Sequence, residues 1–330
     1  TAATNNLNQN YQRNIESARL SNKMAWNLGP TTIEVGGYGV AKQLIHPIFQ
    51  YLDYNYRDFG AYARAVDERQ IAGHENRLTL GVTLSGGWVD NKQFTNTGGN
   101  KGAMQSASED RSFNYIAYAE NAFDLRPDLT LVAGLQVMHS TRERIDEFDN
   151  ATNTSGENEY TFANPKVGLL WRVDPEWQVF GNLSRSAEAP TFGELNFTNA
   201  TLSETEAQEA TTLEIGTRGS RPGLTWDIAV YRAHLKNEFQ FFDLGGGNYS
   251  VTNADDTIHQ GIEAGIGWAF LEGLWEGGDR PDALWLNASY TLNHFTFDDD
   301  ASWGDNDLPG APRHFIRAEV MYKHPTGFFA

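Results

Sequence analysis

The chain has 330 residues, no cysteine, and 43 Asp and Glu against 25 Lys and Arg, for a net charge of -18. The lack of cysteine excludes a disulfide scaffold and thiolate metal chemistry, and the acidic balance argues against nucleic acid as a partner. No run of about 18 apolar residues is present, so we expect no transmembrane helix. A hydrophobic fraction of 40% would by itself favour a soluble all-β protein.

Alternation of apolar and polar residues in the first half of the chain predicts antiparallel strands, because successive strand side chains point to opposite faces. The first two strands flank the tight turn Leu28-Gly29-Pro30. Residues 91–110 have no apolar period and predict a long polar loop. The strands predicted in this half are residues 14–27, 31–45, 54–66, 74–90, 111–123 and 129–144.

The second half of the chain contains the most regular alternation, in two long segments between Leu224 and Phe270. One face of the first segment is apolar from Leu224 to Val230 and becomes charged from Arg232 onward. An apolar band of this height suits a tilted strand crossing a bilayer, which takes about 9–11 residues. The strands predicted here are residues 167–171, 177–184, 210–218, 224–242, 258–270, 283–297 and 314–324.

The connections alternate between short turns and long polar loops, as in outer-membrane barrels. We find no repeat of about 40–50 residues, which a β-propeller would show. The expected fold is therefore all-β, an antiparallel transmembrane β-barrel with about 13 strands in this chain. The expected periplasmic ends are residues 28–30, 124–128, 173–176, 219–223, 271–282 and 324–327. The expected outer loops are residues 91–110, 145–160, 187–208, 242–256 and 298–313.

No enzyme motif is present, because the Gly-rich stretches GGWVDN, TGGNKG and LGGGN lack P-loop or Rossmann spacing. The 8 histidines are scattered, and His259 is more simply a residue of the barrel than a ligand. We therefore expect no catalytic residue, no cofactor site and no metal site.

Two arginines near the outer end of a predicted strand are candidate substrate-binding residues. If the leucines of residues 129–135 face lipid, Arg142 and Arg144 face the lumen. Their guanidinium groups could hold a carboxylate or phosphate in bidentate fashion. The alternative is that they pair with Asp146 and Glu147 in the adjacent loop.

Three aromatic residues in and beside the predicted loop 242–256 complete the candidate site. Phe241, Phe242 and Tyr249 could offer flat apolar contact to an aromatic ligand. The alternative is that they order their own loop by packing within it.

Several segments in colinear order resemble TonB-dependent outer-membrane receptors, nearest to the branch of the ferric citrate and pyrroloquinoline quinone receptors. The segments are YAENAFDLRPDLTLVAGLQV, NLSRSAEAPTFGELNF, TTLEIGTRG, NADDTIHQGIEAGIGW and DLPGAPRHFIRAEVMY. The resemblance implies a barrel of about 22 strands with an N-terminal plug domain. Residues 1–330 would then form a partial barrel domain, with the plug and the terminal strands outside this chain.

The resemblance further implies TonB-coupled active uptake of a scarce, bulky ligand such as a siderophore, metal chelate or redox cofactor. The implied partners are that ligand at the extracellular mouth, the lipid bilayer, and the TonB energy-coupling complex through the N-terminal region. The implied location is the outer membrane of a Gram-negative bacterium. A passive porin and a soluble all-β binding module are the alternatives, and an enzyme is not expected.

Overall fold

The computed structural model describes residues 9–148, 153–195, 205–245, 248–275 and 281–330, and within these the side chains of residues 242–250 are not described. One antiparallel sheet of 13 strands contains every strand except β11 and β12, which pair only with each other. The all-β antiparallel fold is confirmed, and the 13 strands of the large sheet match the number expected for the barrel, whereas β11 and β12 were not predicted as a separate hairpin. No helix in the described residues is long and apolar enough to cross a membrane.

The strands of the first half of the chain are β1 (Asn14–Leu28), β2 (Thr31–Pro47), β3 (Gln50–Ile71), β4 (His74–Thr97), β5 (Asn100–Arg126), β6 (Leu129–Asp146) and β7 (Gly156–Asp174). Those of the second half are β8 (Trp177–Glu188), β9 (Gln208–Arg221), β10 (Leu224–Lys236), β11 (Phe239–Gly245), β12 (Asn248–Asn253), β13 (Asp256–Glu272), β14 (Ala283–Phe297) and β15 (His314–Lys323).

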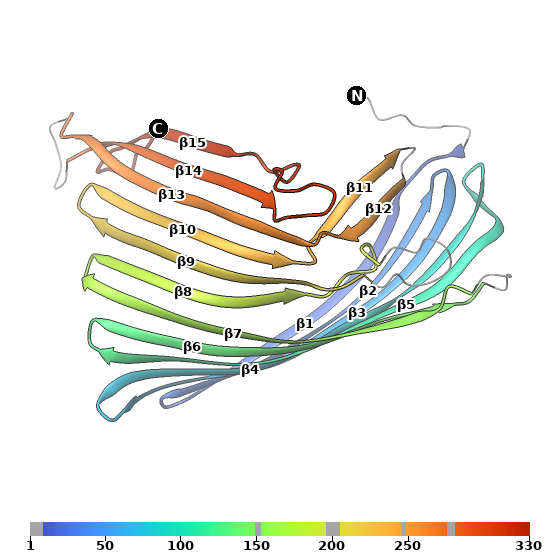
Figure 1. Ribbon diagram of the computed structural model, residues 1–330, viewed down its shortest axis with the longest axis horizontal. Coiled ribbons are helices and arrows are strands. Elements are labelled where there is room, and N and C mark those ends of the chain that lie inside the picture. Colours follow the sequence, from blue (N-terminus) through green and yellow to red (C-terminus); the bar gives the residue numbers. More distant parts are fainter. Residues whose placement is uncertain (1–8, 149–152, 196–204, 246–247, 276–280) are drawn as a thin grey trace.

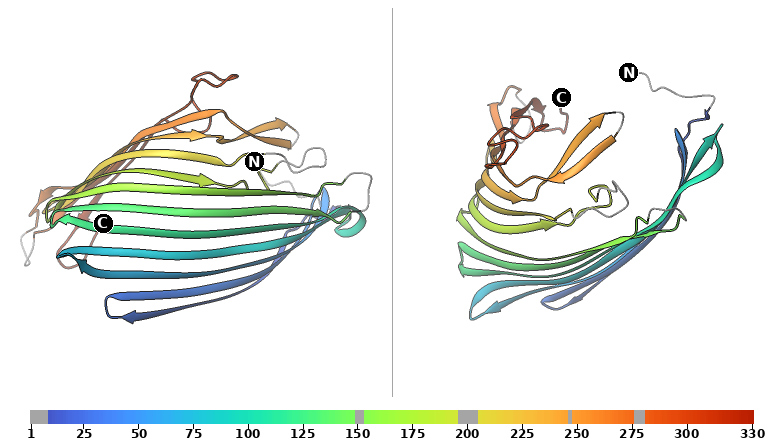
Figure 2. Two further views of the ribbon diagram at one scale, coloured as in Figure 1. Left: turned by 60° about the horizontal axis from the view of Figure 1, so that its bottom comes forward. Right: turned by 45° about the vertical axis from the view of Figure 1, so that its right-hand side comes forward.

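The large sheet curves into an open trough with β1 and β15 at its two edges (Figures 1 and 2). Strands β4 and β5 have 24 and 27 residues, whereas β8 and β10 have 12 and 13. In Figure 1 the tip of β4 and β5 therefore reaches the right-hand end, well past the ends of β8 and β10.

Two expected outer loops are in fact strand. Residues 91–110 form the ends of β4 and β5, which meet at Gly98 and Gly99, both with positive φ. Residues 242–256 contain most of the β11–β12 hairpin. The prediction of loops was wrong here because these segments lack an apolar face, and backbone pairing beyond the apolar part of the sheet needs none. The expected loop 145–160 is shorter, since β6 ends at Asp146 and β7 begins at Gly156.

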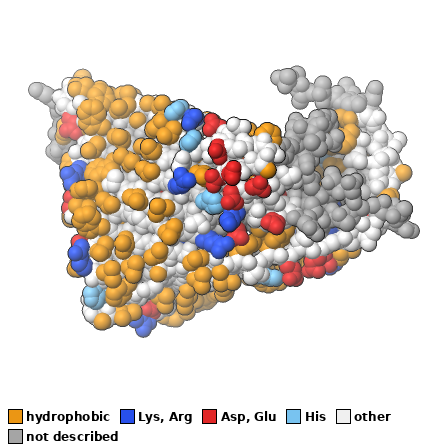
Figure 3. Space-filling view, in the orientation of Figure 1, with side chains coloured by type: hydrophobic (Ala, Val, Ile, Leu, Met, Phe, Trp, Pro, Cys, Tyr) orange, Lys and Arg blue, Asp and Glu red, His pale blue; other side chains and the backbone are white. Residues whose placement is uncertain are grey.

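One face of the sheet, here the outer face, carries exposed apolar side chains in continuous rungs, each rung being residues directly opposite one another on neighbouring strands. We call these side chains the apolar belt. One rung is Met24, Val35, Ala63, Val82, Ala117 and Val137. Another rung, which runs from β6 to β14, is formed by Leu131, Leu169, Gly181, Ile215, Val230, Ile262 and Leu292. Figure 3 shows apolar side chains over one part of this face and charged side chains gathered beside them.

The opposite face, here the lumen face, is lined by polar side chains, glycines and tyrosines. Gly36 lies directly opposite Tyr62, and Tyr38 lies directly opposite Gly60. Each tyrosine ring covers the glycine across from it so closely that a Cβ there would collide with the ring. The two glycines are therefore required by close approach of an aromatic ring.

Buried residues gather inside the trough, at the end of the sheet where β8 and β10 stop. Leu195 is fully buried, and Ala254, Phe297 and Leu308 form a cluster against which Phe295 packs. These residues belong to loops and to the end of β14. We call residues 189–195, residues 205–207 and the β11–β12 hairpin the inner layer. Figure 2 shows the hairpin leaving the sheet toward the hollow side of the trough.

Candidate ligand-binding mouth

Arg144 lies on the lumen face, as the alternation predicted, and is bound to an aspartate on the neighbouring strand. Its Nε donates to Asp110 Oδ1 at 2.6 Å and its Nη2 to Asp110 Oδ2 at 2.8 Å. Asn91 Nδ2 also donates to Asp110 Oδ2, at 2.7 Å. The side chains of Arg144 and Asp110 are only 14% and 5% exposed. Such a bidentate, shielded pair fixes the guanidinium plane more firmly than a surface pair does.

Arg142 also lies on the lumen face, but it is buried beneath the inner layer. Its Nε donates to the backbone oxygen of Pro190 at 2.9 Å, and its Nη1 donates to Asn114 Oδ1 at 3.1 Å and to its neighbour Thr141 O at 2.9 Å. The residue is 7% exposed. Arg142 therefore joins the sheet to the segment that follows β8.

The alternative partners Asp146 and Glu147 are not hydrogen-bonded to either arginine in the described residues. Asp146 Oδ1 accepts from the backbone nitrogen of Phe148 at 2.9 Å, and its Oδ2 accepts from the backbone nitrogen of Thr154 at 2.9 Å. The bond from Phe148, with those from Thr154, holds the pKa of the Asp146 carboxyl below its usual range. Asp146 thus orders its own loop.

The segment after β8 forms one helical turn that the sequence specifies locally. Thr191 and Glu194 have the spacing of a capping box, in which the two side chains satisfy backbone N–H groups at the start of a turn. Glu194 Oε2 accepts from the backbone nitrogen of Thr191 at 2.7 Å, and the nitrogen of Leu195 donates to Thr191 O at 3.0 Å. The side chain of Leu195, at the end of this turn, is fully buried.

Further hydrogen bonds connect the parts of the inner layer to one another and to the sheet. Tyr160 on β7 donates its hydroxyl to Thr205 O at 3.0 Å. Asn253 at the end of β12 accepts from the nitrogen of Glu206 at 2.9 Å and donates to Glu206 O at 2.9 Å. The layer is therefore a connected structure rather than a set of independent loops.

The hairpin carries the three aromatic residues that were predicted to contact ligand. Phe241 lies on β11 opposite Val251 and is 61% exposed, whereas Val251 is buried. Phe242 and Tyr249 lie on β11 and β12, and their side chains fall outside the described part of the structure. The structure thus places the three aromatics on one hairpin, away from the two arginines in sequence but on the same side of the sheet.

A glutamate and a histidine attach the base of the hairpin to the sheet. Glu238 Oε2 and His259 Nε2 are 3.1 Å apart, and Thr257 Oγ1 also donates to this oxygen. The His259 ring stacks on Phe295, with centroids 4.1 Å apart and an interplanar angle of 10°. His259 therefore has a structural contact to a carboxylate, consistent with the expectation that it is a residue of the barrel.

Comparison with known proteins gives a family for this architecture. A family profile described as "TonB dependent receptor-like, beta-barrel" matches residues 1–330. The chain belongs to the TonB-dependent receptor β-barrel family. As the sequence resemblance implied, it is a receptor barrel and not an enzyme.

Solved structures of such receptors have the same fold at low sequence identity. The ferric citrate transporter FecA in its unliganded form aligns with a TM-score of 0.74 and 15% identity, over 94% of this chain and 47% of FecA. The copper transporter OprC aligns with a TM-score of 0.75 and 16% identity, over 94% and 49%. The pyoverdine receptor FpvA from Pseudomonas aeruginosa PAO1 aligns with a TM-score of 0.71 and 16% identity, over 97% and 50%. The chain thus spans about half the length of these proteins.

Below the mouth, the lumen face of the receptor barrel has two grooves with mixed polar and apolar lining. One of about 400 Å³ is lined by Lys166, Arg218, Phe180 and others, and one of about 490 Å³ by Asp227, Arg317 and others. In the described ranges, no group of three or more His, Asp or Glu side chains is placed to hold a metal ion.

The sequence did not predict the hydrogen-bond partners that hold the guanidinium groups of Arg142 and Arg144. Asp110 lay in a segment taken for a loop, and Pro190 contributes only a backbone oxygen, so neither gave a side-chain signal. The Thr191 to Glu194 spacing was the one local pattern that could have predicted an ordered turn beside the mouth.

Proposed function

We propose that the full-length protein is an outer-membrane receptor that takes up a scarce, bulky ligand, such as a siderophore, metal chelate or redox cofactor, by TonB-coupled transport. The observation that carries the proposal is the inner layer, together with membership of the receptor family. Segments that fold back into the trough and are hydrogen-bonded to one another and to the sheet present a fixed surface to a ligand entering the mouth. The apolar belt is the surface that would lie in the bilayer, as in transmembrane barrels.

Five residues remain the proposed ligand contacts: Arg142, Arg144, Phe241, Phe242 and Tyr249. The high exposure of Phe241 supports a direct contact, because burying a large exposed apolar ring against a ligand is energetically favourable. The burial of Arg142 supports an indirect role, since it positions residues 189–195. The Asp110 partner supports a restricted role for Arg144, whose guanidinium would meet an anionic ligand with its charge already compensated.

A whole-cell uptake assay tests the proposal with full-length protein and ferric siderophores or ferric citrate as probes. We expect accumulation that stops when a protonophore collapses the inner-membrane gradient. Alanine at both Arg142 and Arg144 should weaken apparent affinity for an anionic probe by about 1–3 kcal/mol at normal surface expression. Unchanged affinity in that variant would remove the arginines from the site.

A passive porin is the second candidate, and the same assay separates it. A porin would admit small solutes with or without the protonophore and would show no saturation at low ligand concentration. Antibody access gives the orientation independently. Epitope tags at Gly99 and within residues 298–313 should be reached on intact cells, and a tag within residues 124–128 should not. The reverse labelling would invert the assigned orientation.

A further inference from the structure

The outer face of β1 to β5 changes character in three steps as the strands rise above the apolar belt. The register sets directly opposite one another Leu20, Gly39, Phe59, Gly86 and Phe113 in the first rung. The next rung is Ala18, Ala41, Arg57, Trp88 and Arg111. The rung above that is Glu16, Gln43, Asn55, Asp90 and Glu109. Successive rungs lie about 7 Å apart, since each is two residues further along the strand.

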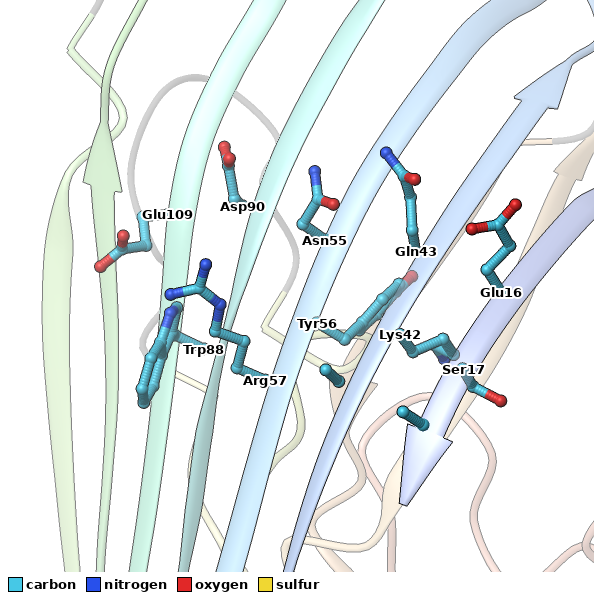
Figure 4. Close-up of a pocket in the computed structure, with 12 residues that line it drawn as sticks. Glu16, Ser17, Lys42, Gln43, Asn55, Tyr56, Arg57, Trp88, Asp90 and Glu109 are labelled. Carbon is cyan, nitrogen blue, oxygen red and sulfur yellow. The ribbon is translucent and has the colours of Figure 1, made fainter. Parts of the chain in front are cut away.

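The two upper rungs enclose a groove of about 680 Å³ on this face. Its floor is open where the small side chains of Ala18 and Ala41 lie opposite each other. Figure 4 shows the carboxylates and amides in a row along one side, with Trp88 and Arg57 along the other. The Arg57 guanidinium carbon lies 6.0 Å from the centre of the Trp88 ring, and Phe59 meets that ring edge-on at 6.4 Å.

Three rungs below Trp88, at the level of Val82, the same face is suited to hydrocarbon. An apolar depression of about 520 Å³ lies on the same face, lined by Ala63, Val82, Ala117, Leu135 and neighbouring side chains of the belt. The small alanine side chains leave room between the larger side chains of this depression, where an acyl chain could pack. One molecule with a polar head and an acyl chain could therefore contact both regions.

We propose that the outer face of β1 to β5 binds a membrane glycolipid, with its sugar head in the upper groove and an acyl chain against the belt. The proposal rests on the membrane position that the proposed function assigns to the belt, but not on uptake. The site is outside the trough, so it is separate from the ligand-binding mouth.

The chemistry of the groove selects a sugar over other polar heads. Sugar hydroxyls both donate and accept hydrogen bonds, which suits a row of carboxylates that accept and amides that do both. The ring of Trp88 offers a flat apolar surface to the C–H face of a sugar. A phosphate head would instead meet the carboxylates Glu16, Asp90 and Glu109. Arg57 is the cation among the outer-face residues that line the groove, and the nearby Lys92 and Arg111 are already paired with Asp90 and Glu109.

Retention of lipids by the full-length protein tests the proposal. The protein is reconstituted in phosphatidylcholine vesicles with equal small fractions of lactosylceramide and phosphatidylglycerol, and the lipids that stay bound are counted by native mass spectrometry. We expect lactosylceramide to exceed phosphatidylglycerol by about tenfold, the effect of two or so net hydrogen bonds.

Variants locate the lipid on the protein. Asn55→Leu and Trp88→Leu should each lower the excess of lactosylceramide about fivefold. Glu16→Leu, at an exposed position of β1, should also lower the excess of lactosylceramide. This variant tests the groove if the other two variants fail to assemble. The matched control is Thr211→Leu, an exposed outer-face position on β9, which should leave retention unchanged.

Three results would overturn the proposal. They are equal retention by the groove variants and the wild type, equal retention of phosphatidylglycerol and lactosylceramide, and loss of the lipid on chelation of divalent cations. The last would mean that a bridging cation holds the head. Ligand uptake measured in the same variants should be normal, so a failure of the uptake proposal would be seen separately.

Discussion

The two halves of the sheet differ at the end that carries the proposed ligand-binding mouth. In the first half β3, β4 and β5 simply continue, with 22, 24 and 27 residues, and their backbone groups stay paired to the tip. In the second half β8 and β10 stop after 12 and 13 residues, and the chain returns into the trough as the inner layer. An extended ladder needs no apolar core, because its backbone is satisfied by the neighbouring strand. A folded layer of loops needs both a core and side-chain anchors, and Leu195 and Arg142 supply them.

The largest expected effect is on folding into the membrane, from charges placed on the apolar belt. The belt runs through both halves of the sheet, so the two halves should respond alike. Ala117→Arg in the first half and Ala288→Arg in the second place a charge on the belt and should each impair folding into vesicles by about 2–4 kcal/mol. Ser289→Arg, on the lumen face, should be milder because the charge stays in water. Similar losses at Ala288 and Ser289 would remove the assigned faces.

Removing the anchor of the inner layer should come next. Arg142→Ala leaves Pro190 O and Asn114 without their charged donor, and each such bond contributes about 1.5–3 kcal/mol. We expect faster hydrogen exchange in residues 189–195 and unchanged exchange at the β4–β5 tip. The control is Arg185→Ala, which breaks an exposed pair with Glu209 and should cost under about 1 kcal/mol. Equal effects of the two variants would mean that the layer holds without its anchor.

The tip of the first half should respond only locally. Gly98 has a φ of +61°, so Gly98→Val should strain the β4–β5 turn by roughly 1–2 kcal/mol. Exchange should rise near the turn and fall back to the wild-type rate a few rungs below. Thr97→Val is the matched control and should have little effect. A loss of protection along the whole of β4 would show that the turn, rather than the ladder, holds this end together.

The smallest expected effect is a pH response confined to the second half. Burial opposes ionisation of Glu238 at the outer mouth, but hydrogen bonds from His259 and Thr257 prevail and hold the pKa of its carboxyl below the ordinary value. A lowered pKa stabilises the hairpin base above the ordinary glutamate value of about 4.3, and this is lost as pH falls through the folded value. A spin label at position 241 (Phe241→Cys) should gain mobility only in acid, and Glu238→Gln should remove that dependence. Release near neutral pH would contradict this assignment.

The strands could be predicted from the sequence because alternation is a local property. Alternating apolar residues such as Leu224, Trp226 and Ile228 show within a few positions which face of the strand is apolar. The register between neighbouring strands follows from short turns such as that at Gly29. The candidate site could not be predicted to the same degree. Arg144 meets Asp110 across 34 positions and Arg142 meets Pro190 across 48, and no local pattern records either pairing. The hairpin β11–β12 was hidden because both of its strands are short and its central residues read as a loop.

The reciprocal glycine and tyrosine pairs on β2 and β3 restrict the order in which this sequence can change. Tyr62 can be replaced while Gly36 stays, because a smaller side chain only uncovers the glycine. A side chain placed first at position 36 would collide with the ring opposite and force that ring to move. The same holds for Gly60 and Tyr38. Neutral drift at these positions therefore has a direction: in a lineage that has lost one of these glycines, the tyrosine across from it should have been lost earlier.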